Sequence, residues 1–440
     1  MAAQSHPSTV SARPPAKGTG AGNGGAGRTG RRILVLSPVC PDPEGRGPGR
    51  RLSACIEALG RTGEVTLVVV AGGGYAPAGG LSPEYLEGRW RIDTAPLVNG
   101  RTWRGRFSRR WAFVHLLVWR RPFAWADIPA ARRRRVAALV AGLGEFDLIH
   151  AYRLCMVETA RELCARRRCR ARLWLDMDDI ESLSHRRMGK RFEVAGELRR
   201  AAEYRWTAVN LAILERWFLP DCDRVFVCSE DDRMRLAGEH PGVRRLPNIA
   251  SLPEPDEAGG GAGRDVAGAF RFLFIGTLDY PPNQEALAWL GTEIWPRLRD
   301  LTGGGLVVAG YGKPGAAGAW LNGAPGVEYL GAVERSAHAF ARADALLVPL
   351  CAGGGTRLKI LEAFARGCPV VGTALAIEGI EAEAEIHFLR AETTDDFVRQ
   401  AARLASDPAL GKRLADAARE LWRNDYSPAA LDRVVADLLD

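Results

Sequence analysis

Long hydrophobic runs are absent from the sequence. The longest candidate, residues 113–119, is far shorter than the ~18 apolar residues of a membrane-spanning helix, and the first residues contain no apolar core of a secretory signal. The nine cysteines are an odd number spread over 440 residues. We therefore expect no disulfide framework and a protein of the reducing cytoplasm. Cys164 and Cys169 lack a second pair of ligands, so we also expect no zinc site.

The composition is that of a globular protein, but the charge is unevenly distributed. Apolar residues make up 47% of the chain and charged residues 25%, which excludes wholesale disorder, and the length predicts two or three domains. Residues 256–440 contain 18 basic and 25 acidic side chains, whereas residues 1–255 contain 42 and 27. The first half therefore favours an anionic partner: nucleic acid, lipid headgroups or a phosphorylated substrate.

The first domain is expected at residues 32–253, after a tail at residues 1–31 whose composition predicts disorder. A buried strand, a glycine- and proline-rich turn, a helix and a second strand follow one another as a βαβ unit, which is typical of parallel sheets. These first elements are predicted at residues 32–37, 41–49, 50–59 and 64–70, and further strands at 147–151, 172–176 and 223–228.

The pattern restarts after a glycine-rich linker at residues 254–269. A second domain is expected at residues 270–425, with a C-terminal helix at 426–440 for which packing back on the first domain is one possibility. Strands are predicted at 270–276, 305–309, 327–330, 345–349 and 369–372, and helices at 283–298, 337–342 and 356–366. The predicted fold class is α/β, with two doubly wound, Rossmann-like domains facing each other across a cleft, where ligands of such sheets bind.

The segment at residues 351–363 has the composition of an anion-binding loop. Gly353, Gly354 and Gly355 follow a buried strand, so consecutive backbone N–H groups can point into one concavity. The helix that begins near Thr356 adds its positive end. The segment also brings two cations and a carboxylate suited to a vicinal diol, namely Arg357, Lys359 and Glu362. Together they suit a nucleoside diphosphate, and the alternative is an ordinary glycine-rich loop beside a solvated face.

Several segments in this order resemble the retaining glycosyltransferases of the GT-B fold, specifically glycosyltransferase family 4, the group 1 transferases. The resemblance extends over about residues 32–430. It is strongest in residues 274–283, 308–312, 327–332 and 353–371, with weaker similarity at 227–232 and 246–248.

The resemblance implies roles for residues of the second domain. Glu362 corresponds to the second acid of the family's E-x7-E motif, which binds the donor ribose, whereas Gly354 stands where the first acid is expected. Backbone amides of residues 353–355 are then expected to contact the donor sugar. The family's Arg/Lys pair for the diphosphate is missing after Gly276, so we assign that role to Arg357 and Lys359.

The resemblance also singles out residues of the first domain. Gly45, Gly47 and Gly49 resemble the family's glycine loop, and a simple tight turn is the alternative. Asp178 and Asp179 stand in the place of the family's His-Asp, so they are candidate catalytic residues; an N-cap role for Asp179 is the alternative. His150 is a candidate for the acceptor side, and a buried core histidine is the alternative.

The implied activity is transfer of a sugar from a nucleotide-diphosphate sugar, with retained anomeric configuration, to a glycan or lipid-linked acceptor in cell-surface polysaccharide or glycoconjugate synthesis. Such enzymes generally need no bound metal and no other cofactor. The alternatives are a sugar-nucleotide 2-epimerase of the same fold and a non-catalytic nucleotide-sugar-binding protein. No nucleic-acid-binding module is recognisable, so nucleic acid is not an expected partner.

Basic residues alternate with tryptophan at residues 101–135, and a second basic cluster follows at residues 186–191. Cations that meet anionic headgroups and indoles that lie at the acyl boundary are typical of interfacial surfaces. This predicts a cytoplasmic enzyme peripheral to the inner face of the plasma membrane. The alternative is a set of solvated helix faces with inward-packed tryptophans.

Overall fold

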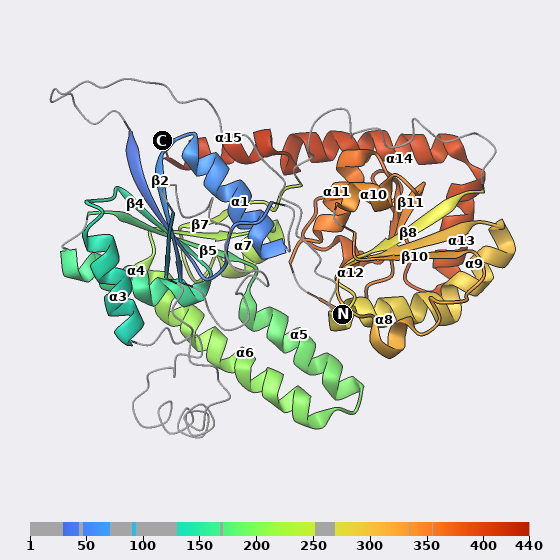
Figure 1. Ribbon diagram of the computed structural model, residues 1–440, viewed down its shortest axis with the longest axis horizontal. Coiled ribbons are helices and arrows are strands. Elements are labelled where there is room, and N and C mark those ends of the chain that lie inside the picture. Colours follow the sequence, from blue (N-terminus) through green and yellow to red (C-terminus); the bar gives the residue numbers. More distant parts are fainter. Residues whose placement is uncertain are drawn as a thin grey trace, which may run out of the picture.

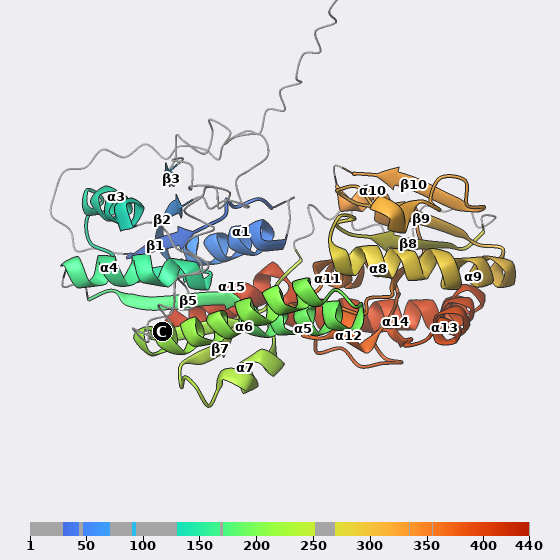
Figure 2. The same cartoon turned by 90° about the horizontal axis from the view of Figure 1, so that it is seen from below.

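Two parallel α/β domains lie side by side in the computed structural model (Figures 1 and 2). The structure describes residues 30–43, 47–70, 90–93, 130–167, 170–250, 269–333, 335–353 and 355–439. The predicted tail and linker therefore lie almost entirely outside the described residues. Within the described part, no helix is long and apolar enough to cross a bilayer.

The first domain is built on a seven-stranded parallel sheet with the order β3-β2-β1-β4-β5-β6-β7. Its inner strands are continuous apolar runs that are buried on both faces, as a parallel sheet covered by helices requires. The strand order reverses between β1 and β4, so their carboxyl ends open a crevice. The strands are β1 (Arg31–Ser37), β2 (Gly63–Val70), β3 (Trp90–Asp93), β4 (Leu148–Tyr152), β5 (Arg172–Asp178), β6 (Arg224–Val227) and β7 (Val243–Arg245). The α-helices are α1 (Gly47–Gly60), α3 (Ala130–Ala141), α4 (Val157–Arg167), α5 (Glu181–Val194), α6 (Leu198–Phe218) and α7 (Glu230–Leu236).

The second domain has a six-stranded parallel sheet with the order β10-β9-β8-β11-β12-β13, which reverses between β8 and β11. The strands are β8 (Arg271–Ile275), β9 (Gly305–Ala309), β10 (Val327–Gly331), β11 (Ala345–Val348), β12 (Val370–Gly372) and β13 (Leu389–Arg390). The α-helices are α8 (Pro281–Trp289), α9 (Trp295–Thr302), α10 (Ser336–Phe340), α11 (Leu358–Arg366), α12 (Ala374–Ile377), α13 (Thr394–Ser406), α14 (Pro408–Leu421) and α15 (Pro428–Leu439). The predicted fold class of two doubly wound domains is therefore confirmed.

The last helix, α15, leaves the second domain and packs on the first. Leu431, Val435 and Leu439 belong to the hydrophobic core that α1 and the first sheet share. Arg61 forms an ion pair of 2.6 Å with Asp432 at the edge of this contact. The chain therefore passes between the domains twice, once after β7 and once before α15 (Figure 1).

Some elements differ from the sequence prediction. The helix expected at residues 283–298 begins at Pro281, because proline is well tolerated where the backbone N–H has no helical partner. It continues through a π-helical turn at Leu290–Ile294 to Thr302. The helix expected at 356–366 begins at Leu358. The long pair α5 and α6, which the sequence did not predict, packs side by side and extends from the first domain toward the second (Figures 1 and 2).

Candidate functional site

A cavity of about 350 Å³ lies at the carboxyl ends of β8, β9 and β11, and the first domain closes one side of it. Its size fits the range of small-molecule sites, and its place is the topological switch point of the second sheet. The first domain contributes Gly47 and Arg50 to its lining. The second domain contributes, among others, Gly276, Thr277, Tyr280, Asn283, Tyr311, Ser336, Gly353, Thr356, Arg357, Lys359 and Glu362.

The glycine-rich loop adopts a backbone that ordinary residues avoid. Gly353 has a φ of 121° and Gly355 a φ of 68°, and both lie in the region that favours glycine. Gly354 lies outside the described residues. A Cβ on Gly353 would lie 3.3 Å from Arg357 Nη2, so the loop can approach the guanidinium closely only because that atom is missing. The predicted loop thus brings its backbone to the same place as one predicted cation.

Arg357 is buried at the N-cap of α11, with its Nη1 atom 2.5 Å from the carbonyl oxygen of Gly355. Burial is the main cause that lowers the pKa of this arginine. Its Nη2 atom is buried and has no hydrogen-bond partner among the described residues. A buried guanidinium with an unused donor is a group that an anionic ligand would satisfy.

Lys359, two residues later, points to the same region. Its Nζ atom lies 3.1 Å from Asn283 Oδ1, and it is 5.3 Å from the centre of the Phe274 ring. A Cβ on Gly276 would approach Nζ to 3.0 Å, so glycine makes room for the ammonium group. Burial, and secondarily the charge of Arg357, lower the pKa of Lys359 to about 7. The ammonium group of Lys359 therefore lies beside Gly276, directly after β8. This is the place where the resemblance implies an Arg/Lys pair that the sequence lacks.

Glu362 lies on the cavity side of α11 and is 5% exposed. Its Oε1 atom is 2.6 Å from Arg50 Nη2 of the first domain and accepts a hydrogen bond of 3.2 Å from Ser336 Oγ. The carboxylate thus lines the same cavity as Arg357 and Lys359. Its contact with a ribose stays a prediction.

Gly47 and Gly49, which were predicted in a glycine-rich turn, instead form the first turn of α1, and this turn lies directly against α11. Gly47 faces Leu358, whose Cδ1 atom would be 3.8 Å from a Cβ at that position. Gly49 has no room for a side chain, because a Cβ would lie 3.2 Å from the carbonyl oxygen of Cys40. Gly45 lies outside the described residues. Arg50 and Arg51, which follow Gly49 on α1, were not predicted as site residues, although the run of glycine and arginine at residues 45–51 was a visible signal.

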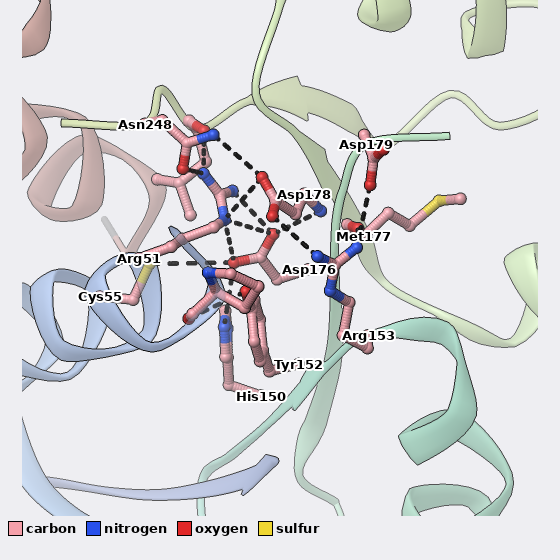
Figure 3. Close-up of polar contacts among 12 residues, drawn as sticks. Arg51, Cys55, His150, Tyr152, Arg153, Asp176, Met177, Asp178, Asp179 and Asn248 are labelled. Carbon is pink, nitrogen blue, oxygen red and sulfur yellow. Dashed lines mark hydrogen bonds and ion pairs between the residues drawn. The ribbon is translucent and has the colours of Figure 1, made fainter. Parts of the chain in front are cut away.

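A buried polar network closes the carboxyl end of β5 (Figure 3). Arg51 pairs with Asp176 at 2.7 Å, and its Nη1 atom donates to Asn248 Oδ1 at 2.9 Å. Burial alone would raise the pKa of Asp176, but Arg51 and the nearby His150 hold it well below its usual range. His150 is 1% exposed, with Nε2 3.7 Å from Asp176 Oδ2, so it lies inside this network and does not line the cavity described above.

The two candidate catalytic aspartates lie where this network meets the second domain. Asp178 has a φ of 66° and Arg153 a φ of 74°, both strained conformations for residues other than glycine. Arg153 holds both carboxylates, Asp178 at 3.1 Å and Asp179 at 2.9 Å (Figure 3). Burial raises the pKa of Asp178. A Cβ on Gly355 would lie 3.8 Å from the Cβ of Asp179, so the aspartates adjoin the glycine-rich loop of the other domain.

Helix α5 adds a second set of contacts across the cleft. Arg187 forms a bidentate pair with Glu378, with distances of 2.6 and 2.8 Å. Arg191 pairs with Glu285 and also donates to the carbonyl oxygen of Cys351 at 3.3 Å. Two arginines of the basic cluster that was assigned to a membrane surface are therefore engaged with the second domain.

No group of three or more side chains able to hold a metal ion occurs among the described residues.

Comparisons with known proteins agree with this architecture. Residues 269–407 match the family model described as "Glycosyl transferases group 1". A sucrose-phosphate synthase from Thermosynechococcus elongatus has a similar structure, with a TM-score of 0.63 and 18% identity over 93% of this chain and 98% of that one. HepE of Anabaena in complex with UDP and glucose has a TM-score of 0.60 and 14% identity over 93% and 99%. The apo form of WaaB, a lipopolysaccharide outer core galactosyltransferase, has a TM-score of 0.56 and 11% identity over 93% and 99%. A search of curated proteins found no match.

The two-domain fold is that of GT-B glycosyltransferases, and the protein is an enzyme of this class (EC 2.4). Within that class, the second domain matches the model of the group 1 glycosyltransferases over residues 269–407. The resemblance that the sequence motifs indicated is thereby confirmed.

Proposed function

We propose that the protein is a retaining glycosyltransferase that moves a sugar from a nucleotide-diphosphate sugar to a glycan or lipid-linked acceptor. The observation that carries the proposal is the pair Arg357 and Lys359. Both cations have lowered pKa values and both face one interdomain cavity beside a glycine-rich loop. Cations whose charged forms are destabilised by burial are suited to bind an anionic ligand that stabilises those charged forms.

The chemistry of this arrangement is stabilisation of a leaving group. When the bond between the sugar and the diphosphate breaks, negative charge grows on the diphosphate, and Arg357 and Lys359 oppose it without reorganisation of water. Backbone N–H groups of the loop at residues 353–355 are suited to the same anion. Glu362 accepts hydrogen bonds from the ribose. Asp178 and Asp179 do not line the cavity, but Asp179 adjoins Gly355 of the glycine-rich loop, and we place the approach of the acceptor hydroxyl on that side.

The relatives support a UDP-sugar as donor and a surface glycan as product. The Anabaena protein was solved with UDP and glucose, and WaaB is named for a lipopolysaccharide outer core. We infer that this enzyme works in the synthesis of a cell-surface polysaccharide or glycoconjugate. Neither nucleic acid nor a bound metal has a part in this proposal.

The test is a panel of UDP-, GDP-, ADP- and TDP-sugars, with thermal stabilisation measured first and sugar transfer to glycan and lipid-linked acceptors second. One donor should stabilise the protein clearly more than the others. Glu362→Ala should fold but lose most of that stabilisation, because each charged hydrogen bond is worth about 1.5–3 kcal/mol. Unchanged donor affinity in the folded variant would remove Glu362 from the site. Turnover of the donor to an epimer without acceptor would favour the 2-epimerase instead.

We also propose a peripheral position on the inner face of the plasma membrane. The support is the sequence of residues 101–135, most of which lies outside the described residues. In α5 only Arg186 and Lys190 are fully exposed members of the second basic cluster. Residues 101–135 therefore carry most of this proposal.

A further inference from the structure

Arg50 and Arg51 are consecutive on α1 but serve different domains. Neighbouring residues of a helix point about 100° apart, so only one of them can enter the core. Arg51 does so and pairs with Asp176. Arg50 instead reaches across the cleft to Glu362, at 2.6 Å, with side chains that are 18% and 6% exposed.

We propose that Arg50 exchanges partners when the donor binds: it releases Glu362 to the ribose hydroxyls and moves onto the diphosphate. The inference rests on the proposed function, because it takes the ligand to be a nucleoside diphosphate sugar. Through Arg50, the first domain contacts the donor directly. Arg50 is then a donor-binding residue that distinguishes a diphosphate from a nucleoside.

Arg50 and a ribose diol would compete for the carboxylate of Glu362. One oxygen of this carboxylate already accepts from Arg50 and from Ser336. A ribose diol that approaches the same buried carboxylate from the cavity competes with the guanidinium for acceptor positions and for space. A diol can use both oxygens of Glu362 only when Arg50 leaves Oε1.

The guanidinium of Arg50 would lose its counter-ion when it leaves Glu362. The Arg50 side chain is only 18% exposed. A guanidinium that leaves its carboxylate in such a place needs another anion close by, because an unpaired and largely buried charge is destabilised. The donor brings such an anion to the same cavity in the same event. Arg50 lines this cavity together with Arg357 and Lys359, so a long side chain can reach the diphosphate without a change of helix position.

The segment after β8 contributes few cationic side chains to the cavity. Thr277 and Asn283 line the cavity there, and neither carries a charge. Lys359, with a pKa near 7, is only partly charged at neutral pH before an anion binds. A further arginine from the opposite wall would complete the neutralisation of a diphosphate, and among the described residues of the first domain Arg50 is the arginine that lines the cavity.

The experiment measures binding of a nucleoside, its monophosphate and its diphosphate by calorimetry, with the base that stabilises the wild-type protein most. Arg50→Ala should weaken diphosphate binding about tenfold or more and leave nucleoside binding equal or tighter. Arg50→Lys should recover part of the diphosphate affinity. Arg61→Ala is the matched control, because Arg61 follows the same helix but pairs with Asp432 outside the cavity; it should bind all three ligands like the wild type.

Two outcomes would overturn the exchange. Equal weakening of all three ligands in Arg50→Ala would make Arg50 a structural residue of the cleft. If Arg50→Ala bound the diphosphate like the wild type and the nucleoside more tightly, Arg50 would only block Glu362 in the free protein and would not bind the diphosphate. Failure of the proposed function would be seen in the wild-type protein instead. If the wild type binds no nucleoside diphosphate, both the proposed function and the exchange of partners are wrong.

Discussion

At the scale of single residues, the proposed contact of Lys359 with the donor predicts that donor binding depends on pH. Its pKa in the free protein is about 7, lowered by burial and by Arg357, and a bound diphosphate favours the charged form and raises the pKa. Above pH 7 the free lysine is mostly neutral and must take up a proton when the donor binds. We expect the affinity for the nucleotide sugar to fall by up to about tenfold per pH unit between pH 7 and 9.

Calorimetry at several pH values, in buffers of different ionisation enthalpy, measures both the affinity and the proton uptake. Lys359→Arg is the control variant, because arginine keeps its charge over this range. Its affinity should be nearly independent of pH. A slope as steep as that of the wild type would show that another group titrates.

A second prediction at this scale concerns the buried pair of Arg51 and Asp176. Removal of one partner leaves the other charge buried without compensation, which typically costs 3–5 kcal/mol. We expect Asp176→Ala to lower the free energy of unfolding by about 3–5 kcal/mol, measured by denaturation with guanidinium chloride at pH 7. Asp416→Ala, which breaks an exposed pair with Lys412, should leave the transition almost unchanged. A similar loss in both variants would contradict the special role of the buried pair.

At the scale of elements, α15 belongs energetically to the first domain. Leu431 is 2% exposed in a core shared with α1 and β1, so Leu431→Ala should cost about 2–5 kcal/mol, the usual range for a buried leucine. Hydrogen exchange should become faster in α1 and β1 but remain unchanged in β8. Asp437→Ala, at an exposed position of the same helix, serves as control. Equal effects in both domains would argue against this assignment.

The elements also show how far sequence reasoning reaches. Buried parallel strands such as β1 and β8 were predictable, because they are short apolar runs rich in branched residues. Helix α6 was missed, since its apolar residues do not gather on one face: Leu198 and Val209 are exposed, whereas the polar residues Asn210 and Glu215 are buried. Hydrophobic periodicity carries no signal for such a helix.

One part of the candidate site could likewise be predicted from the sequence, and another part could not. The glycine-rich loop, Arg357, Lys359 and Glu362 are close in sequence, so their grouping in one cavity could be predicted from local spacing. The contact of Arg50 with Glu362 joins residues of different domains, and no local pattern encodes how two domains are placed. The same holds for the pairs that α5 makes with Glu285 and Glu378.

At the scale of the whole molecule, the distribution of charge predicts binding to anionic membranes. Cosedimentation with anionic and neutral liposomes at low and high salt should show binding to the anionic vesicles alone, weakened by salt, because screening reduces attraction between surface charges. A variant with five arginines changed to glutamine, Arg101, Arg104, Arg106, Arg109 and Arg110, should lose most of this binding. Equal failure of the wild type with both vesicle types would rule out the membrane proposal.

The return of α15 to the first domain has a consequence for how the protein is made. The ribosome delivers residues 30–250 long before residues 428–439, so the apolar surface of α1 that α15 covers stays open while the whole second domain is synthesised. The second domain, which is continuous in sequence, can fold first although it emerges later. A truncated first domain produced alone would keep that surface exposed and would tend to aggregate unless a peptide of residues 428–439 were supplied in trans.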